Sequence, residues 1–455
     1  MTSLIARVFP QVVQNIDDRL ARELGYPSMA SFGVHTKEFP HYRFVDLYRT
    51  VEEYCKSRSE VMTIDSEQEE DLNSLLHGKR KKYISRRIKR SRNTAWPVGP
   101  AEEVYLPVDR FWLCKPSTPQ SRDRLIFRLR YDEVLAKATL EVASEDPSFG
   151  ESCLTRLAAR SVENSVYRNR LLELTFESGA KDQYGDIERT ERFRVMFKAT
   201  EPVGDEDIVI DEEVRETLRR NVIDLHLKRD MLKAHHVPIR RGVLLYGPPG
   251  TGKTFACRYL CGKLPNITRI VATGAALLQV NSIFSLARTL QPSLVILEDV
   301  DLVFSSREVN LYSSVLGDLL DQMDGLRPHE DIGFILTTNS IDRMEAAIKD
   351  RPGRISQCIY FGAPKAELRK RYLLHYLQRY KTSALDVDKL VAESDGATQA
   401  FLKEWVHRSV QIATERLASQ YVELELQNED FREAMREMRR FSEGSTGRII
   451  GFHTA

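Results

Sequence analysis

The sequence lacks any CxxC pair and any cysteine spacing typical of a zinc site, although it holds six cysteines among 455 residues. This pattern predicts reduced thiols rather than disulfides or metal ligands. Runs of about 18 apolar residues, which membrane-spanning helices need, are also missing. The N-terminal residues contain no apolar signal block, and Asp17 and Asp18 do not fit a transit peptide. Together these absences predict a cytoplasmic protein that makes no contact with a membrane.

An excess of one charge sign is missing as well, since 67 Lys and Arg residues face 66 Asp and Glu residues. A net charge of +1 gives no global signal for binding a polyanion. Residues 79–92 (KRKKYISRRIKRSR) are a local exception with nine Lys or Arg residues. Two interpretations of this segment stay open: a solvated linker or helix face, or a contact with nucleic acid or an acidic partner.

The pattern of apolar residues changes near residue 200. Residues 1–200 mix segments of helical period with segments of alternating polarity, which is typical of an α+β region. Residues 201–364 carry short apolar runs separated by helical segments, which predicts an α/β domain with a parallel sheet covered on both faces. Residues 365–441 are predicted to form a helical lid, and residues 442–455 a tail. The five apolar runs are GVLLYG, TRIVA, SLVILE, GFILTT and QCIYFG.

A glycine-rich segment follows the first of these runs and opens a helix. Its residues 247–254, GPPGTGKT, fit the pattern G-x-x-x-x-G-K-[ST] in the strand–helix context that the pattern requires. Gly250 and Gly252 permit positive φ angles, so that backbone N–H groups point toward phosphate oxygens beside the positive end of the helix. We expect Lys253 to reach the outer phosphates and Thr254 to supply a hydroxyl ligand for Mg²⁺. The expected nucleotide-binding residues of this loop are Gly247, Pro248, Pro249, Gly250, Thr251, Gly252, Lys253 and Thr254.

The run SLVILE passes directly into acidic residues. Glu298 and Asp299 follow the apolar residues 294–297. A charge at the end of a buried strand is costly unless water, a metal or a cation receives it. In a P-loop fold the acid-tipped strand lies beside the P-loop strand, where one carboxylate holds Mg²⁺ through water and another acts as the base on the attacking water.

These two motifs and the segments co-linear with them resemble the AAA family of ATPases, within the AAA+ superfamily. Over residues 203–420 the resemblance also includes LLDQMDGL (319–326), TTNSIDRMEAAIKDRPGR as the second region of homology, and GATQAFLKE (396–404) as part of the helical lid. The pattern is similar to that of single-ring bacterial AAA proteins with an α+β N-terminal domain. The resemblance implies a five-stranded parallel sheet of order 5-1-4-3-2, a ring that is usually a hexamer, and ATP bound with Mg²⁺ between subunits.

The resemblance also assigns roles to single residues. Asn339 falls in the sensor-1 position, which orients the attacking water, and Arg351 and Arg354 fall on arginine-finger positions. Asp207 and Ile208 match the stretch that lines the adenine. Because both arginines lie on a loop away from their own P-loop, a guanidinium that acts on transition-state charge must come from a neighbouring subunit. Pairing of these arginines with nearby acids is the alternative.

Two features depart from the family pattern. The acid-tipped strand of the family normally ends Asp-Glu, whereas this one ends Glu-Asp, so that the alignment places Glu298 on the metal side and Asp299 in the base position. The family's pore loop, an aromatic–apolar–glycine triplet, is expected between RIVA and PSLVIL. Phe284 is the one aromatic in that interval, and its helical neighbours suggest that it packs in the core. The apolar residues left for a weak pore surface are Leu277, Leu278 and Val280.

We therefore expect an enzyme that converts ATP and water to ADP and phosphate. It would form a homo-oligomeric ring and remodel a protein or other macromolecular partner recognised by residues 1–200. One alternative is a nucleotide-gated scaffold that recruits an effector and moves no polypeptide, which the missing pore aromatic favours. The other is a nucleic-acid-associated ATPase that uses the basic residues 79–92.

Overall fold

The chain divides into two compact units. Unit 1 consists of Met1–Arg168 and Phe176–Lys198, and unit 2 of Asn169–Thr175 and Ala199–Ala455. The computed structural model describes residues 15–24, 31–58, 61–78, 84–116, 123–177, 192–199, 203–237, 239, 241–304, 309–327, 329–341, 355–416 and 424–442. Asn169–Thr175, which the sequence pattern groups with the N-terminal region, is thus part of unit 2.

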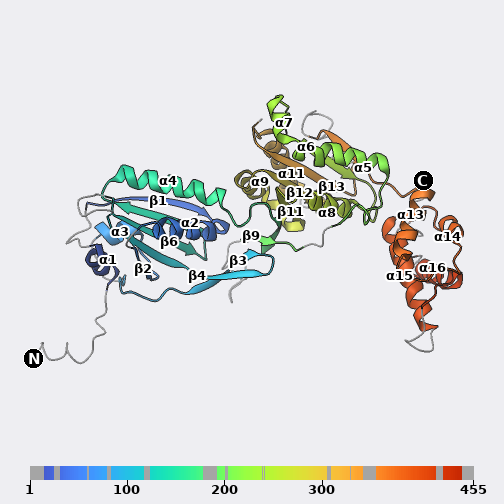
Figure 1. The fold of residues 1–455 in the computed structure, drawn as a ribbon, viewed down its shortest axis with the longest axis horizontal. Coiled ribbons are helices and arrows are strands. Elements are labelled where there is room, and N and C mark those ends of the chain that lie inside the picture. Colours follow the sequence, from blue (N-terminus) through green and yellow to red (C-terminus); the bar gives the residue numbers. More distant parts are fainter. Residues whose placement is uncertain are drawn as a thin grey trace, which may run out of the picture. The chain divides into compact units, whose positions relative to one another are not determined.

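Unit 1 is built around an antiparallel sheet in the order β1-β7-β6-β5-β2 (Figure 1). Successive side chains of a strand point to opposite faces, which explains the alternating sequence pattern. Phe111 and Leu113 pack on one face, whereas Trp112 and Cys114 pack on the other. Both faces are therefore buried. The strands are β1 (Gly33–Pro40), β2 (Val61–Asp65), β5 (Asp109–Cys114), β6 (Leu125–Asp132) and β7 (Lys137–Ser144), with a separate hairpin of β3 (Asn93–Gly99) and β4 (Glu102–Pro107).

Helices cover both faces of this sheet. α2 (Phe44–Lys56) and α4 (Pro147–Glu163) share an apolar core with one face, and α1 (Ile16–Leu24) and α3 (Leu72–His77) with the other. The start of α4 is set by its sequence, because the Asp146 carboxylate accepts the backbone N–H of Ser148 at 2.9 Å and a proline follows at the first helical position. Unit 1 is thus an α+β arrangement with two cores.

One arginine of the basic segment 79–92 is an internal residue of unit 1. Arg86 is 5% exposed, and its Nε donates to Glu70 Oε2 at 2.6 Å while its Nη1 donates to Asp17 Oδ2 at 3.1 Å. Both interpretations made from the sequence, a solvated side chain or one that contacts nucleic acid, are therefore wrong for Arg86. A run of charges does not reveal which of its members will meet an acidic partner on folding. The exposed basic residues in the described part of the segment are Arg87, Lys89, Arg90 and Arg92.

Arg86→Gln is expected to destabilise unit 1 by about 3–5 kcal/mol, because it leaves the carboxylate of Glu70 buried without its cation. The matched control Arg87→Gln changes an exposed neighbour and should shift the free energy of unfolding by less than about 0.5 kcal/mol. Denaturant unfolding, followed by tryptophan fluorescence, measures both. Equal stability of the two variants would show that the buried ion pair contributes nothing.

The second sheet runs in the order β14-β10-β13-β12-β11-β8-β9. The pairings from β14 through to β8 are parallel, as an α/β domain requires. The five strands expected from the sequence lie side by side in the order β14-β10-β13-β12-β11, and the sheet has more strands than expected because β8 pairs with β11 and β9 follows β8. The short alternating pattern of β8 does not indicate which sheet it joins. The strands are β8 (Leu171–Glu177), β9 (Arg192–Phe197), β10 (Arg241–Tyr246), β11 (Thr268–Thr273), β12 (Ser293–Glu298), β13 (Ile332–Thr338) and β14 (Gln357–Tyr360).

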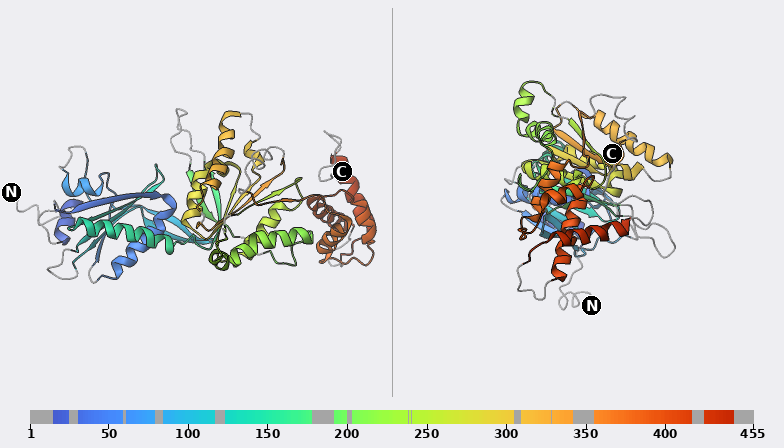
Figure 2. Two further views of the ribbon diagram at one scale, coloured as in Figure 1. Left: turned by 90° about the horizontal axis from the view of Figure 1, so that it is seen from above. Right: turned by 90° about the vertical axis from the view of Figure 1, so that its right-hand side faces the viewer.

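Along the chain, helices lie between many of the strands of this sheet. After the last strand, further helices form a bundle with its own core (Figures 1 and 2). In the bundle, Trp405 Nε1 donates to the carbonyl oxygen of Phe431 at 2.8 Å. Within the described ranges, no helix is long and apolar enough to cross a membrane. The helices before the bundle are α5 (Glu212–Leu218), α6 (Asp224–Leu227), α7 (Arg229–Ala234), α8 (Lys253–Lys263), α9 (Val280–Thr289), α10 (Asp301–Phe304) and α11 (Val309–Asp324). The bundle contains α13 (Ala366–Leu377), α14 (Val387–Glu393), α15 (Gln399–Glu415) and α16 (Asn428–Ser442).

Candidate functional site

The loop between β10 and α8 follows a path that depends on glycine. Gly247, Gly250 and Gly252 have φ angles of 141°, 78° and 100°. A Cβ atom at Gly247 would overlap the carbonyl oxygen of Phe361, and one at Gly252 would overlap the side-chain oxygen of Gln399. The loop is closed by Thr251, whose Oγ1 donates to the Pro248 carbonyl at 2.8 Å. The turn leads directly into the N-terminus of α8, an arrangement suited to binding an anion.

Lys253, at the start of α8, is fixed by three oxygen acceptors. Its Nζ donates to the carbonyls of Gly247 at 2.7 Å and Pro248 at 2.9 Å, and to Asn339 Oδ1 at 2.9 Å. Burial lowers the pKa of Lys253, while Asp299 and Asp301 act in the opposite direction by favouring the charged form. The ammonium group is therefore held beside the glycine-rich loop before any ligand arrives.

The acid-tipped strand turns at Asp299. β12 ends at Glu298, and Asp299 adopts a φ of 51°, which is uncommon for a residue with a side chain. Asn339 Nδ2 donates to Asp299 Oδ1 at 3.3 Å, while Asn339 Oδ1 accepts the bond from Lys253. One amide thus joins the acid-tipped strand to the glycine-rich loop. These residues meet because β10, β12 and β13 are parallel, which brings their carboxyl ends to the same edge of the sheet.

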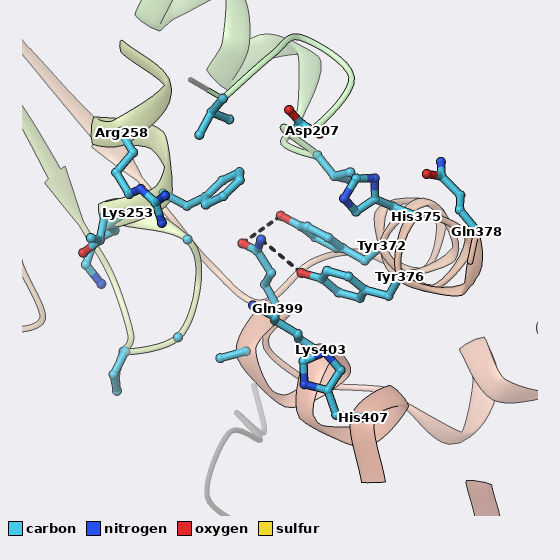
Figure 3. A pocket seen from close by; sticks show the side chains of 18 of the residues that line it. Asp207, Lys253, Arg258, Tyr372, His375, Tyr376, Gln378, Gln399, Lys403 and His407 are labelled. Atoms are coloured by element: carbon cyan, nitrogen blue, oxygen red, sulfur yellow. Dashed lines mark hydrogen bonds between the residues drawn. The ribbon is translucent and has the colours of Figure 1, made fainter. Parts of the chain in front are cut away.

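A cleft of about 910 Å³ opens at this edge and is completed by helices α13 and α15 of the bundle. Figure 3 shows Lys253 and Arg258 on one side of the cleft, and Tyr372, Tyr376 and Gln399 on the other. Its size falls in the range of pockets that enclose small molecules, roughly 300–1,000 Å³. Asp299 and Asn339 line the cleft, whereas Glu298 is not among the described residues that do so.

The bundle contacts the glycine-rich loop directly. The backbone N–H of Ala400 donates to the Gly250 carbonyl at 3.0 Å. Tyr372 donates its hydroxyl hydrogen to Gln399 Oε1 at 3.2 Å, and Gln399 Nε2 donates to the Tyr376 hydroxyl oxygen at 3.3 Å (Figure 3). The start of α15 therefore rests on the loop, and the Gln399 amide joins it to the two tyrosines of α13.

The cleft contains most of the residues expected from the sequence. Asp207 lines it, and its Oδ2 accepts the Gly204 N–H at 2.9 Å. The side chain of Ile208 instead packs in the core of the sheet domain, whereas Val209, the next residue, lines the cleft and packs with the core of the bundle. The loop residues that line the cleft are Pro249, Gly250, Gly252, Lys253 and Thr254. Arg351 and Arg354 lie outside the described residues.

Sequence reasoning did not identify the contribution of the bundle side chains. Tyr372, Tyr376, Gln399 and Lys403 line the cleft, although no motif in the sequence assigns any of these four residues to a binding site. Tyr372 and Tyr376 are spaced by one helical turn, which is also the spacing of ordinary core residues. The one available signal was the segment GATQAFLKE, which contains Gln399 and Lys403 and resembles a lid segment.

Contrary to the expectation from the sequence, the acid-tipped strand β12 does not lie next to β10, because β13 is between them, although all three strands end at the same edge of the sheet. A glycine-rich loop between a strand and a helix, with a fixed lysine and an acid-tipped strand that ends at the same edge, defines a P-loop nucleotide-binding domain. Residues 243–363 match the family described as "ATPase family associated with various cellular activities (AAA)". The nucleotide-binding part of this chain is therefore a AAA ATPase domain.

Curated proteins that are similar to the chain carry the same kind of domain. The 26S proteasome regulatory subunit 8 homolog of Schizosaccharomyces pombe is 31% identical over 212 residues, which are 43% of this chain and 52% of that protein. The proteasome-activating nucleotidase of Sulfurisphaera tokodaii is 32% identical over 212 residues, 43% of this chain and 53% of that protein. The ATP-dependent zinc metalloprotease FtsH 2 of a Thermoanaerobacter species is 29% identical over 242 residues, 50% of this chain and 45% of that protein. The chain spans about half the length of these relatives.

Proposed function

We propose that this protein is a ring-forming ATPase that hydrolyses ATP between subunits and uses the energy to remodel a macromolecular partner. The observation that carries the proposal is the hydrogen-bonded series Lys253–Asn339–Asp299 at the mouth of the glycine-rich loop. This series places a cation, an amide and a carboxylate in one cleft. In phosphoryl transfer to water, such groups bind the phosphates, orient the attacking water and accept its proton. The parallel sheet then corresponds to the large AAA+ subdomain, and the bundle over residues 365–441 to its helical lid.

The residues of the cleft fit a nucleotide polyphosphate. At Gly247, Gly250 and Gly252 the backbone can approach phosphate oxygens closely, and Lys253 supplies a fixed positive charge. Thr254 and Glu298 are the side chains that would hold Mg²⁺, which when bound neutralises phosphate charge. Asp207 and Val209 also line the cleft, and we assign them to the side that contacts the adenine of the nucleotide.

Asp299 is the residue that we assign to water activation. Its carboxylate lies at the cleft, beyond the metal-side position of Glu298, and is held by the Asn339 amide. A carboxylate in this position accepts a proton from the attacking water, and the amide orients it. The Asn339 amide is therefore hydrogen-bonded to both residues: its oxygen accepts from Lys253 and its nitrogen donates to Asp299.

Assembly into a ring, as a hexamer, rests on resemblance to the AAA family and on two arginines. Arg351 and Arg354 fall on arginine-finger positions of that family, and such residues complete the site of a neighbouring subunit. The relative from Schizosaccharomyces pombe is named as a regulatory subunit of the 26S proteasome, which supports action within an assembly.

Arg351→Ala and Arg354→Ala are expected to bind ATP normally and to lose most turnover. Mixing either variant with Lys253→Ala should restore activity, since random mixing leaves about one interface in four with an intact loop and an intact arginine. ATPase rate against the mixing ratio measures this restoration.

The matched control is a mixture of Lys253→Ala with the double variant Lys253→Ala/Arg354→Ala, in which every loop is defective and no activity should return. If the first mixture stays inactive although subunits exchange, the arginines act within their own chain and the proposal of a shared site fails.

A scaffold that recruits an effector is the second candidate function, and one observation favours it. Phe284, the single aromatic of the interval expected to hold the pore loop, is fully buried and stacks on Phe334 at 5.3 Å between ring centroids. Leu277 and Val280 are buried as well, which leaves Leu278, 41% exposed, as the apolar side chain of that surface. Strong binding of an unfolded polypeptide in the pore would need a larger exposed apolar surface than this one side chain provides.

One affinity experiment distinguishes the candidate functions. The Asp299→Asn variant, loaded with ATP, is used to capture partners, and Lys253→Ala serves as the nucleotide-free control. A protein that binds in ATP and is released on hydrolysis by wild type supports remodelling. A stoichiometric partner that stays bound through hydrolysis supports the scaffold. Captured material that nuclease removes supports binding of nucleic acid by the exposed residues Arg87, Lys89 and Arg90.

A further inference from the structure

Asp299 occupies a backbone conformation that needs external support. A φ of 51° places a residue with a side chain in the left-handed region, which is costly unless surrounding groups hold it there. The turn at Asp299 is what carries its carboxylate from the end of β12 to the cleft. Any group that fixes this turn therefore acts on the position of the proposed base.

Thr337 is such a group. It lies on β13, next to β12, and is fully buried. Its Oγ1 accepts the backbone N–H of Asp299 at 2.9 Å, and its carbonyl oxygen accepts the N–H of Val300 at 3.0 Å. One residue of the neighbouring strand thus holds two consecutive N–H groups of the turn. A buried N–H left without an acceptor is costly, so the hydroxyl stabilises this conformation against alternatives.

Asp301 supports the other partner of the pair. Its Oδ1 accepts the backbone N–H of Asn339 at 3.0 Å. The backbone of Asn339 is thus held by Asp301, while its side chain contacts Lys253 and Asp299. The two supports are therefore crossed: a residue of β13 fixes the turn after β12, and a residue after β12 fixes the turn after β13.

We propose that Thr337 and Asp301 are positioning residues, which fix the Asp299 carboxylate and the Asn339 amide relative to Lys253. Neither residue is assigned to contact the nucleotide. The inference rests on the proposed ATPase function and deepens it, since it states how the chain holds its base in a strained turn. Loss of either support should lower the rate of hydrolysis and leave nucleotide affinity intact.

Thr337→Val keeps the shape of the side chain and removes the acceptor, whereas Thr337→Ser keeps the hydroxyl. We expect kcat to fall about tenfold or more in Thr337→Val, as for loss of one good hydrogen bond that holds the backbone of the proposed base in place. The KM for ATP and the affinity for a non-hydrolysable ATP analogue should change less than about twofold, because the loop and Lys253 are untouched. Thr337→Ser should retain most of the activity.

Asp301 gives an independent pair of variants, which keeps the inference testable if Thr337→Val does not fold. Asp301→Asn retains an oxygen that can accept the Asn339 N–H, whereas Asp301→Ala does not. We expect Asp301→Ala to lose about tenfold in kcat and Asp301→Asn to lose little. Circular dichroism and thermal unfolding verify that each variant is folded before its kinetics are compared.

The results separate this inference from the function beneath it. Absence of ATPase activity in the folded, assembled wild type, or unchanged affinity in Lys253→Ala, removes the proposed function itself. If wild type hydrolyses ATP and Thr337→Val matches it in kcat, or Thr337→Ser is as slow as Thr337→Val, the hydroxyl does not position the base. If Asp301→Asn is as slow as Asp301→Ala, charge rather than the hydrogen bond is what matters there, and that half of the inference is overturned.

Discussion

Lys253→Ala is expected to abolish binding of MgATP. Lys253 is the cation fixed within the glycine-rich loop, and its Nζ already faces the carbonyl oxygens of Gly247 and Pro248. A charge-assisted hydrogen bond from a buried ammonium group is much stronger than one in water, so its loss removes the main attraction for the outer phosphates. Affinity should fall by at least about 100-fold, equivalent to about 2.7 kcal/mol. Isothermal titration calorimetry with ATP and Mg²⁺ measures it.

Lys370→Ala provides the matched control for this variant. Lys370 lies on α13 and pairs with Asp388 at 2.6 Å on the exposed surface of the bundle. Its removal takes away the same charge and should leave ATP affinity unchanged, because an exposed pair contributes little. A Lys253→Ala protein that binds ATP as wild type does would contradict the assignment of the loop at residues 247–254.

The parts of the site that sequence predicts are those whose chemistry is local. The glycine-rich loop is continuous in the chain, and three of its glycines adopt the positive φ angles that the anion-binding pattern depends on. The parallel sheet can also be predicted from the sequence, because buried strands carry near-continuous apolar runs. The contact between Asp299 and Asn339 follows from the sheet, because parallel strands end at a common edge, which brings together turns that are distant along the chain.

The parts that sequence does not predict depend on contacts between distant segments. Gln399 joins Tyr372 to Tyr376 and rests against Gly252, and no local pattern specifies such a contact. Arg86 shows the same limit in unit 1. Arg87, next to it in the chain, is equally basic but exposed, whereas Arg86 is buried against the carboxylate of Glu70. Periodicity reports which face of an element is buried, whereas the identity of the polar partner is decided by tertiary structure.

The order of the two acids at the end of β12 is one of two features in which this chain departs from the AAA family pattern, and the two acids differ in where they lie. Glu298 is the last residue of the strand, whereas Asp299 lies in the turn and lines the cleft. Asp299 receives the Asn339 amide at 3.3 Å. An aspartate is one carbon shorter than the glutamate that this position normally holds, and the positive φ of Asp299 is a local feature that alters where its carboxylate lies.

Asp299→Asn is therefore expected to bind ATP and to hold it without hydrolysis, with kcat lowered by about 100-fold or more. The amide cannot accept a proton from water, yet every contact from the glycine-rich loop and Lys253 is kept. Glu298→Gln should behave differently, because it weakens the site for Mg²⁺ rather than the base. Its nucleotide affinity should drop, and excess Mg²⁺ should partly restore turnover. Retention of radiolabelled nucleotide on the isolated protein, together with ATPase rates over a series of Mg²⁺ concentrations, distinguishes the two.

Thr337→Ser serves as the control for this pair, since it alters a residue of the same network while keeping its hydrogen bond to the Asp299 backbone. It should release nucleotide and depend on Mg²⁺ as wild type does. The opposite assignment makes an opposite prediction. If Glu298→Gln traps ATP with a normal Mg²⁺ dependence while Asp299→Asn loses nucleotide and is rescued by Mg²⁺, then Glu298 is the base. In that case the left-handed turn at Asp299 would direct the Asp299 carboxylate toward Mg²⁺. The hydrogen bond from Asn339 would then orient this carboxylate rather than the attacking water.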